Sequence, residues 1–216
     1  MRFEYFDDLS QKQVVRLLDM PDLQKSFYAN ASDFVVLSWD AGQLPLEDFA
    51  GVLTGPELGD VVQASVIADS SARASEIWAY REGISESLSE RAPYLHKQDI
   101  SLPANQMEQF LQSLQDRLDE HAGRLQQAVF GHHGDGNLHL NIFSDAEGDS
   151  AFKDVETFSR AIKRLDAEFL GLIASLGGSI SAEHGIGLLK TGYLGLNRSD
   201  AEIEIMRGLK RAFDPR

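Results

Sequence analysis

The sequence of 216 residues contains no cysteine. Disulfide bonds, thiolate metal ligands and a cysteine nucleophile are therefore excluded. The sequence also lacks any run near the ~18 to 20 apolar residues that are needed to cross a bilayer. Its first residues do not follow the basic-then-apolar pattern of a signal peptide. We expect a cytoplasmic protein.

Positive charge is scarce. Lys and Arg number 20 against 34 Asp and Glu, which gives a formal net charge of −14. This charge disfavours nucleic acid or an anionic membrane as a partner. The apolar content of 43% is that of an ordinary globular domain, and the length suffices for one good core or two small ones.

Short β-branched or alternating stretches predict strands at 33–40, 60–68, 97–102, 126–133 and 138–143. Apolar residues at helical spacing predict helices at 69–90, 103–121, about 150–176 and 199–213, the last opened by the capping-box pair Ser199 and Glu202. A tight turn joins two of these strands directly, so at least one pair is an antiparallel hairpin. We therefore expect an α+β fold, in which a mostly antiparallel sheet has helices packed on one face and its other face open.

The stretch "GHHGDGNLH", residues 131–139, holds three of the six histidines. Its Asp135-Gly136 pair is a favourable two-residue hairpin loop, because both positions tolerate a positive φ. With that loop, His132 and His139 would stand directly opposite each other on one sheet face, with Cβ atoms ~5 Å apart. Two imidazoles at this separation can hold one metal ion.

Alternation along the hairpin sorts the remaining side chains. Asn141 joins the two histidines on their face, whereas His133 falls with the apolar set and is interpreted as structural. Taken alone, a histidine pair in a hairpin more often serves packing or surface chemistry. The interpretation as a metal site therefore depends on a third ligand.

The stretch "SAEHGIG", residues 181–187, offers that ligand. Glu183 would complete a set of two histidines and one carboxylate, which suits Zn²⁺, Mn²⁺ or Fe²⁺ and leaves positions open for a substrate. His184 would then be a base beside the metal. Alone, the same letters also fit a helix N-terminus with ordinary polar residues.

Two cations lie at informative positions. Arg81 falls on the apolar stripe of its predicted helix with Ile77 and Ile84, so its guanidinium must extend to solvent or find an anion. Lys97 alternates with Ile100 and therefore leaves the core face, as either a site residue or a solvated lysine would.

Together, "GHHGDGNLHLN" and "SAEHGIGLLK" resemble the C-terminal cap domain of FAD-linked oxidases of the vanillyl-alcohol oxidase type, in the branch with D-lactate, glycolate and D-2-hydroxyglutarate dehydrogenases. The resemblance extends to "FEYFD", "IWAYREGISE", "KQDISLP" and "MRGLKRAFDP", so it covers nearly all of residues 1–216 as one domain. It implies ferredoxin-like halves in the fold and an N-terminal FAD-binding domain that is absent from this chain. No glycine-rich nucleotide loop is found here.

The same resemblance assigns roles to individual residues. It implies that His184 is the catalytic base and that the metal ligands are His132, His139 and Glu183. The implied substrate contacts are Arg81, Ser85, Lys97 and Asn141. Ser85 stands where the D-2-hydroxyglutarate branch usually has Thr.

The function implied by the resemblance is oxidation of a small D-2-hydroxy acid to its 2-oxo acid, with a divalent metal (Zn or Mn) and with FAD bound mainly by the missing domain. Electrons would pass to an acceptor such as an electron-transfer flavoprotein or a quinone, and the protein could form a homodimer. This chain alone should then be inactive. Judged on its residues, the chain could also be a stand-alone metallohydrolase that uses the same two-His, one-Glu site, or a non-catalytic cap or binding module.

Overall fold

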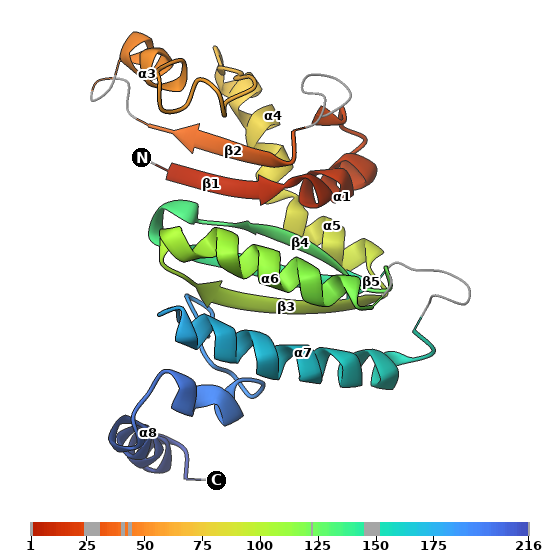
Figure 1. Ribbon diagram of the computed structural model, residues 1–216, viewed down its shortest axis with the longest axis vertical. Coiled ribbons are helices and arrows are strands. Elements are labelled where there is room, and N and C mark those ends of the chain that lie inside the picture. The colour runs from red at the N-terminus through yellow and green to blue at the C-terminus, as the bar shows by residue number, and fades with distance from the viewer. Residues whose placement is uncertain are drawn as a thin grey trace.

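The computed structural model describes residues 2–23, 31–39, 42, 45–121, 123–144 and 152–215. Its centre is a single antiparallel sheet of five strands in the order β2-β1-β4-β5-β3 (Figure 1). The strands are β1 (Arg2–Asp7), β2 (Asp33–Ser38), β3 (Tyr94–Ser101), β4 (Gln126–Gly131) and β5 (Asn137–Ser144). Helices pack on this sheet, so the predicted α+β class is confirmed.

One face of the sheet is covered by α6 (Met107–Asp119) and α7 (Val155–Ser175). In Figure 1, α6 lies in front of the sheet and α7 runs along β3. Leu138, Leu140 and Ile142 alternate onto this face of β5 and form the larger apolar core with both helices. This core anchors the strand that carries His139.

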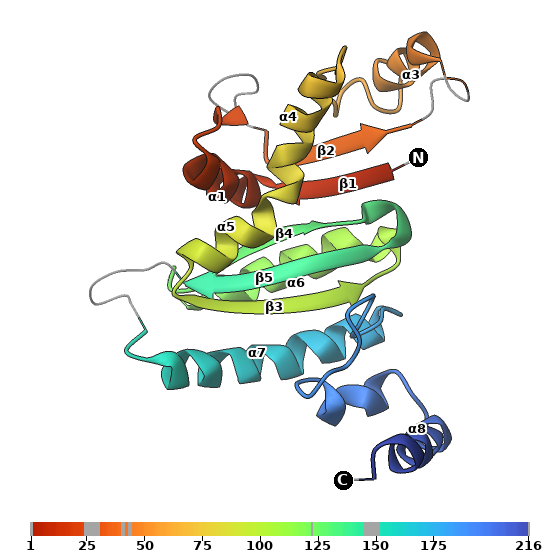
Figure 2. The ribbon, with the colours of Figure 1, turned by 180° about the vertical axis from the view of Figure 1, so that it is seen from behind.

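The opposite face is covered in part by α1 (Asp8–Leu18), α4 (Ser71–Glu82) and α5 (Ile84–Arg91). In Figure 2, α4 and α5 lie in front of the sheet. Phe130 and Phe143 alternate onto this face and form a second core with Ile84 and Leu88. The expectation that helices pack on one face only is therefore wrong, because these aromatic side chains need cover from water. The remainder of this face carries polar side chains.

The β4–β5 hairpin differs from the predicted alignment by two residues. Phe130, and not the expected histidine, lies opposite His139, and the turn contains a short 3₁₀ segment at His133–Asp135. Gly136 has φ 83°, and its carbonyl accepts the Leu102 N–H at 3.0 Å. The turn is thus held by a contact with Leu102, the residue that follows β3, as well as by its own residues. A shift of two keeps the alternation of side chains, so both candidate metal ligands remain on one face.

Other helix predictions hold with smaller changes. The predicted helix 69–90 is two helices, α4 and α5, which meet at Gly83. The last helix, α8 (Asp200–Phe213), begins with the predicted capping box. Residues 150 and 151 of the long predicted helix, and residue 40 of the first predicted strand, lie outside the described residues.

Among the described residues, one predicted strand is wrong and four elements were missed. Residues 60–68 pair with no described strand, and their side chains Val61, Val66 and Ile67 are exposed. The elements without a prediction are β1, α1, α3 (Leu46–Leu53) and the 3₁₀ helix Thr191–Leu196. No helix within the described ranges combines the length and the apolar character that a membrane span requires.

Candidate metal centre and substrate site

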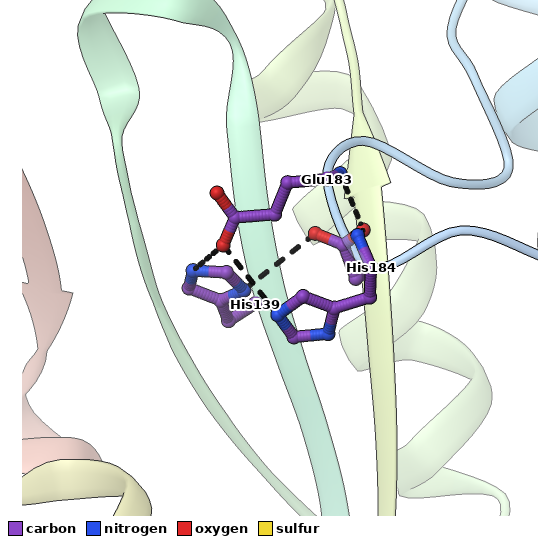
Figure 3. Close-up of side chains that lie close together, drawn as sticks. His139, Glu183 and His184 are labelled. Atoms are coloured by element: carbon purple, nitrogen blue, oxygen red, sulfur yellow. Dashed lines mark hydrogen bonds and ion pairs between the residues drawn. The ribbon is translucent and has the colours of Figure 1, made fainter.

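The predicted third ligand and base meet the histidine hairpin on the polar part of the second sheet face. In Figure 3, Glu183 and His184 lie on a loop beside His139 of β5. Glu183 Oε1 is 3.4 Å from His139 Nε2 and 3.4 Å from His184 Nε2. The rings of the two histidines stack with their centroids 5.4 Å apart. Two stretches more than 40 residues apart in the sequence therefore form one cluster.

His132 approaches the same carboxylate from its other side. Its Nε2 lies 4.0 Å from Glu183 Oε2, and its ring centroid is 5.5 Å from that of His139. Its Nδ1 lies 2.8 Å from Glu4 Oε1 of β1. The two histidines predicted as ligands thus both approach the carboxylate of the third predicted ligand, Glu183, although they are not cross-strand partners.

The donor set fits a divalent ion that binds nitrogen and oxygen. The ligand atoms of Asp99, His139, Glu183 and His184 all lie within 4.8 Å of one another, and His132 lies outside this tighter group. Burial lowers the pKa of His139, and the nearby positive charge of Arg81 lowers it further, while the carboxylates of Glu183 and Asp99 oppose the shift. His139 is therefore neutral at pH 7, which is the form that binds a metal. Imidazole and carboxylate donors together suit zinc or manganese.

Two buried carboxylates of the site were missed in the sequence. Glu4 is 1% exposed and contacts His132, and Asp99 is 4% exposed and contacts the loop of Glu183. Alternation could have placed Asp99, because it lies two residues from Lys97 and so shares its face. Glu4 gave no such signal, because it lies two residues from the apolar Phe6 and so shares a face that the sequence pattern would assign to the core.

Arg81 finds its anion within the chain. It is 8% exposed, and its Nε and Nη2 lie 3.0 and 2.9 Å from Glu4 Oε2. The guanidinium also lies over the Phe130 ring at 4.6 Å. Burial raises the pKa of Glu4, but the His132 hydrogen bond, the Arg81 charge and the Arg2 hydrogen bond outweigh it, so the net pKa is lowered. Glu4 is therefore an ionised partner for both Arg81 and His132.

Lys97 and Ser85 lie close together on the site face. Lys97 is the cross-strand partner of Asn141, and its Nζ lies 3.4 Å from Ser85 Oγ and 2.8 Å from Ser89 Oγ. It forms no ion pair with any residue that the structure describes. The Asn141 amide donates to the backbone carbonyls of Ala128 and His139. Lys97 therefore offers a positive charge to a ligand, while the amide of Asn141 holds strands.

His133 lies apart from this cluster. Its ring packs against those of Phe3 and Tyr5, with centroids 5.8 and 5.6 Å apart. Burial lowers its pKa. The interpretation of His133 as a structural residue agrees with this packing.

A family model of the C-terminal domain of FAD linked oxidases matches residues 9–216. The chain belongs to this family. Among its relatives, the D-2-hydroxyglutarate dehydrogenase of Xanthomonas citri pv. viticola is 36% identical, across 99% of this chain and 43% of the relative. The mitochondrial D-2-hydroxyglutarate dehydrogenase of Bos taurus is 33% identical, across 99% of this chain and 37% of the relative.

A third relative carries a different name. A putative mitochondrial D-lactate dehydrogenase of Schizosaccharomyces pombe is 32% identical, across 72% of this chain and 29% of the relative. The chain thus spans less than half the length of each of these three relatives. Membership of the family confirms the resemblance carried by the two histidine-containing stretches.

Proposed function

We propose that this chain is the substrate- and metal-binding part of an FAD-linked dehydrogenase that oxidises a D-2-hydroxy acid to the 2-oxo acid. The observation that carries the proposal is the gathering of His132, His139 and Glu183 beside His184. Family membership supports the flavin chemistry. Residues 1–216 would form the cap domain, and FAD would be bound by a domain outside them.

The residues divide the reaction between them. His132, His139 and Glu183 would hold a divalent ion, zinc or manganese, which would supply the positive charge that lowers the pKa of the substrate hydroxyl. His184, which is exposed, takes the hydroxyl proton on its imidazole. FAD, bound by a domain outside residues 1–216, would supply the acceptor for a hydride from the substrate's α-carbon. Loss of the proton to His184 and of the hydride to FAD would convert the alcohol to the oxo acid.

The charges on the site face favour a diacid. Lys97 has the Ser85 hydroxyl beside it and forms no ion pair in the described parts of the chain, so we assign it a substrate carboxylate. Arg81 lies close to His139, but the buried Glu4 neutralises its charge, so it is not counted here. The ion held by His132, His139 and Glu183 would, with Lys97, supply two positive centres, which exceed what one carboxylate requires and favour D-2-hydroxyglutarate over D-lactate or glycolate. The names of several relatives support this choice.

The test is to restore the flavin. The chain alone and the chain joined to the FAD-binding domain of a relative are assayed with a dye as electron acceptor, on D-2-hydroxyglutarate and D-lactate. The chain alone should show no turnover, and the joined enzyme should oxidise D-2-hydroxyglutarate with the higher kcat/KM. In the joined enzyme, His184→Ala should lower kcat by ~10²- to 10⁴-fold, because it removes the general base.

A neighbouring histidine supplies the control. His132→Ala with His139→Ala should abolish metal retention and turnover, whereas His133→Ala should leave both unchanged, because His133 packs away from the cluster. Turnover without flavin would contradict the proposal and favour a metallohydrolase. A strong preference for D-lactate would overturn the choice of a diacid. The electron acceptor and the homodimer remain predictions from the resemblance.

A further inference from the structure

The carboxylate of Asp99 lies beside the candidate metal ligands and faces two of the segments that carry them. Asp99 is buried on β3, where it is the cross-strand partner of His139. One of its oxygens is directed at the loop that carries Glu183, and the other at the His139 ring. The sequence assigned no role to this residue.

The first oxygen holds the loop. Asp99 Oδ2 accepts the backbone N–H groups of Ala182, Glu183 and His184, at 2.9, 2.8 and 2.8 Å. Successive N–H groups that converge in this way form a concave anion-binding site, and a charged acceptor strengthens each bond. Both the ligand Glu183 and the base His184 are therefore fastened to β3 through a single atom.

The second oxygen faces a histidine nitrogen. Asp99 Oδ1 is buried and has no hydrogen-bond partner among the described residues, and it lies 3.7 Å from His139 Nδ1. A buried acceptor without a donor is unfavourable, and a proton on Nδ1 would supply the donor after a small approach. With that proton on Nδ1, the free lone pair of His139 is on Nε2, the nitrogen that faces Glu183 at 3.4 Å. This is the tautomer that a metal ligand of this orientation requires.

The other candidate ligand shows the same arrangement. His132 has Glu4 Oε1 at 2.8 Å from Nδ1, and its Nε2 faces Glu183 at 4.0 Å. Each histidine thus has a buried carboxylate behind Nδ1 and the shared carboxylate in front of Nε2. Because the carboxylates come from β1 and β3, the arrangement arises twice from independent elements.

We propose that Asp99 is a positioning residue of the metal centre, whose two oxygens set the orientation of His139 and the placement of the loop that carries Glu183 and His184. The proposal rests on the proposed function, since it concerns the same ion. Asp99 acts through these residues and does not itself bind the ion, because Oδ2 is committed to three amides and Oδ1 lies on the Nδ1 side of His139.

Two substitutions separate the two contacts. In Asp99→Asn, the side-chain carbonyl should keep facing the three amides, so the NH₂ group meets His139 Nδ1 and donates to it. His139 then carries its proton on Nε2, which opposes ligation. Asp99→Ala removes both contacts. Asp166→Asn is the matched control, because Asp166 also pairs with a histidine, His96 Nε2 at 2.9 Å, but does so where α7 packs on β3, away from the cluster.

Zinc affinity is measured by competition with a chelating dye, and amide exchange of residues 182–184 is measured by NMR in metal-free protein. We expect Asp99→Asn to weaken zinc binding ~10- to 100-fold at an unchanged melting temperature, and Asp166→Asn to leave it unchanged. Asp99→Ala should accelerate exchange of the three amides at least ~10-fold, because their acceptor is lost. In zinc-loaded wild type, the ¹⁵N shifts of His139 should identify Nε2 as the bound nitrogen.

Wild-type zinc affinity in Asp99→Asn, or zinc on Nδ1 of His139, would overturn the role of Oδ1. Equal exchange of the three amides in wild type and Asp99→Ala would overturn the role of Oδ2. If the wild type binds no zinc at all, the metal centre of the proposed function fails. The exchange measurement needs no metal, so it still decides whether Asp99 holds the loop.

Discussion

Asp7 joins three elements through one side chain. It ends β1, and its Oδ1 accepts the Ser10 N–H at 2.8 Å, which caps α1. Its Oδ2 accepts the Val129 N–H of β4 at 2.8 Å. Burial raises the pKa of Asp7 to about 6, and the charge of Asp33 adds to the rise, while the hydrogen bonds oppose it. A residue outside the site therefore gives the fold a sensitivity to pH.

The sign of that sensitivity follows from the shift. Between pH 3.8 and about 6, the folded chain binds a proton at Asp7 that the unfolded chain has lost. The contribution of Asp7 to the free energy of unfolding is therefore greatest below this range and declines as the pH rises through it. We expect the wild type to lose up to ~3 kcal/mol relative to Asp7→Asn between pH 4 and pH 7. Urea unfolding of both proteins at the two pH values measures this, and a wild type that gains stability relative to Asp7→Asn as the pH rises would contradict it.

At the scale of elements, the turn of the β4–β5 hairpin depends on one glycine. Gly136 combines φ 83° with a close approach, since an added Cβ would lie 2.4 Å from the Leu102 carbonyl oxygen. Gly123 has a similar φ, 76°, but an added Cβ there would meet open space. An alanine at Gly123 would therefore test the backbone conformation alone, whereas an alanine at Gly136 would test the conformation and the steric contact together.

We expect Gly123→Ala to lower the free energy of unfolding by ~1 to 2 kcal/mol, because alanine disfavours a left-handed backbone. Gly136→Ala should lower it further, since the methyl group also displaces Leu102 or the turn. Zinc affinity should fall only in Gly136→Ala, because His132 begins this turn. Urea unfolding and zinc titration of both variants measure these effects. Equal losses at the two positions would show that the contact with Leu102 has no role.

The elements that the sequence predicted are those whose pattern is local. Alternation identified β3, β4 and β5, and helical periodicity identified α6, α7 and α8. The helix is interrupted at Gly83, which lies in close contact with α1, since an added Cβ there would lie 3.1 Å from Val14 and 3.2 Å from Leu18. Periodicity within 69–90 carries no information about α1, so the segment was predicted as one helix.

The same limit applies to the site. The ligands lie in two compact stretches, and residue types and alternation were enough to propose them. Glu4 and Asp99 support those ligands from 128 and 84 residues away in the sequence, as the contacts with His132 and the Glu183 amide show. The hairpin register was wrong by two residues, and the hairpin turn contacts Leu102, which follows β3 and is no part of the local pattern. Long-range contacts, and not local propensity, account for these errors.

At the scale of the whole molecule, α8 stands out because most of its apolar side chains are exposed. It lies beneath the C-terminal half of α7 (Figure 1), and none of its described residues is buried. Ile205, Met206, Leu209 and Phe213 are exposed and lie on one stripe of the helix, and Phe213 is 86% exposed. Exposed apolar surface of this kind promotes association between molecules in water.

We therefore expect this chain, studied without any partner domain, to self-associate as its concentration rises. Ile205→Glu combined with Leu209→Glu should reduce that association, because it places charges on the apolar stripe. Val155→Glu is the control, since Val155 is 66% exposed at the far end of α7. Sedimentation velocity over a range of concentrations measures the effect. Undiminished association in the double variant would place the contact elsewhere.

The end of β3 has a consequence for how the chain can change during evolution. Ser101 exchanges two backbone hydrogen bonds with Ser179, the Leu102 N–H binds the Gly136 carbonyl, and Asp99 holds the amides before Gly185. The distance between the ligands is thus fixed by hydrogen bonds between neighbouring segments and not by the number of residues that separate the ligands in the sequence. The connections that lead from β3 to the hairpin and from the hairpin to the loop can therefore gain or lose residues while the ligands keep their separation. Substitutions within these few residues of β3, by contrast, would disturb both groups of ligands together.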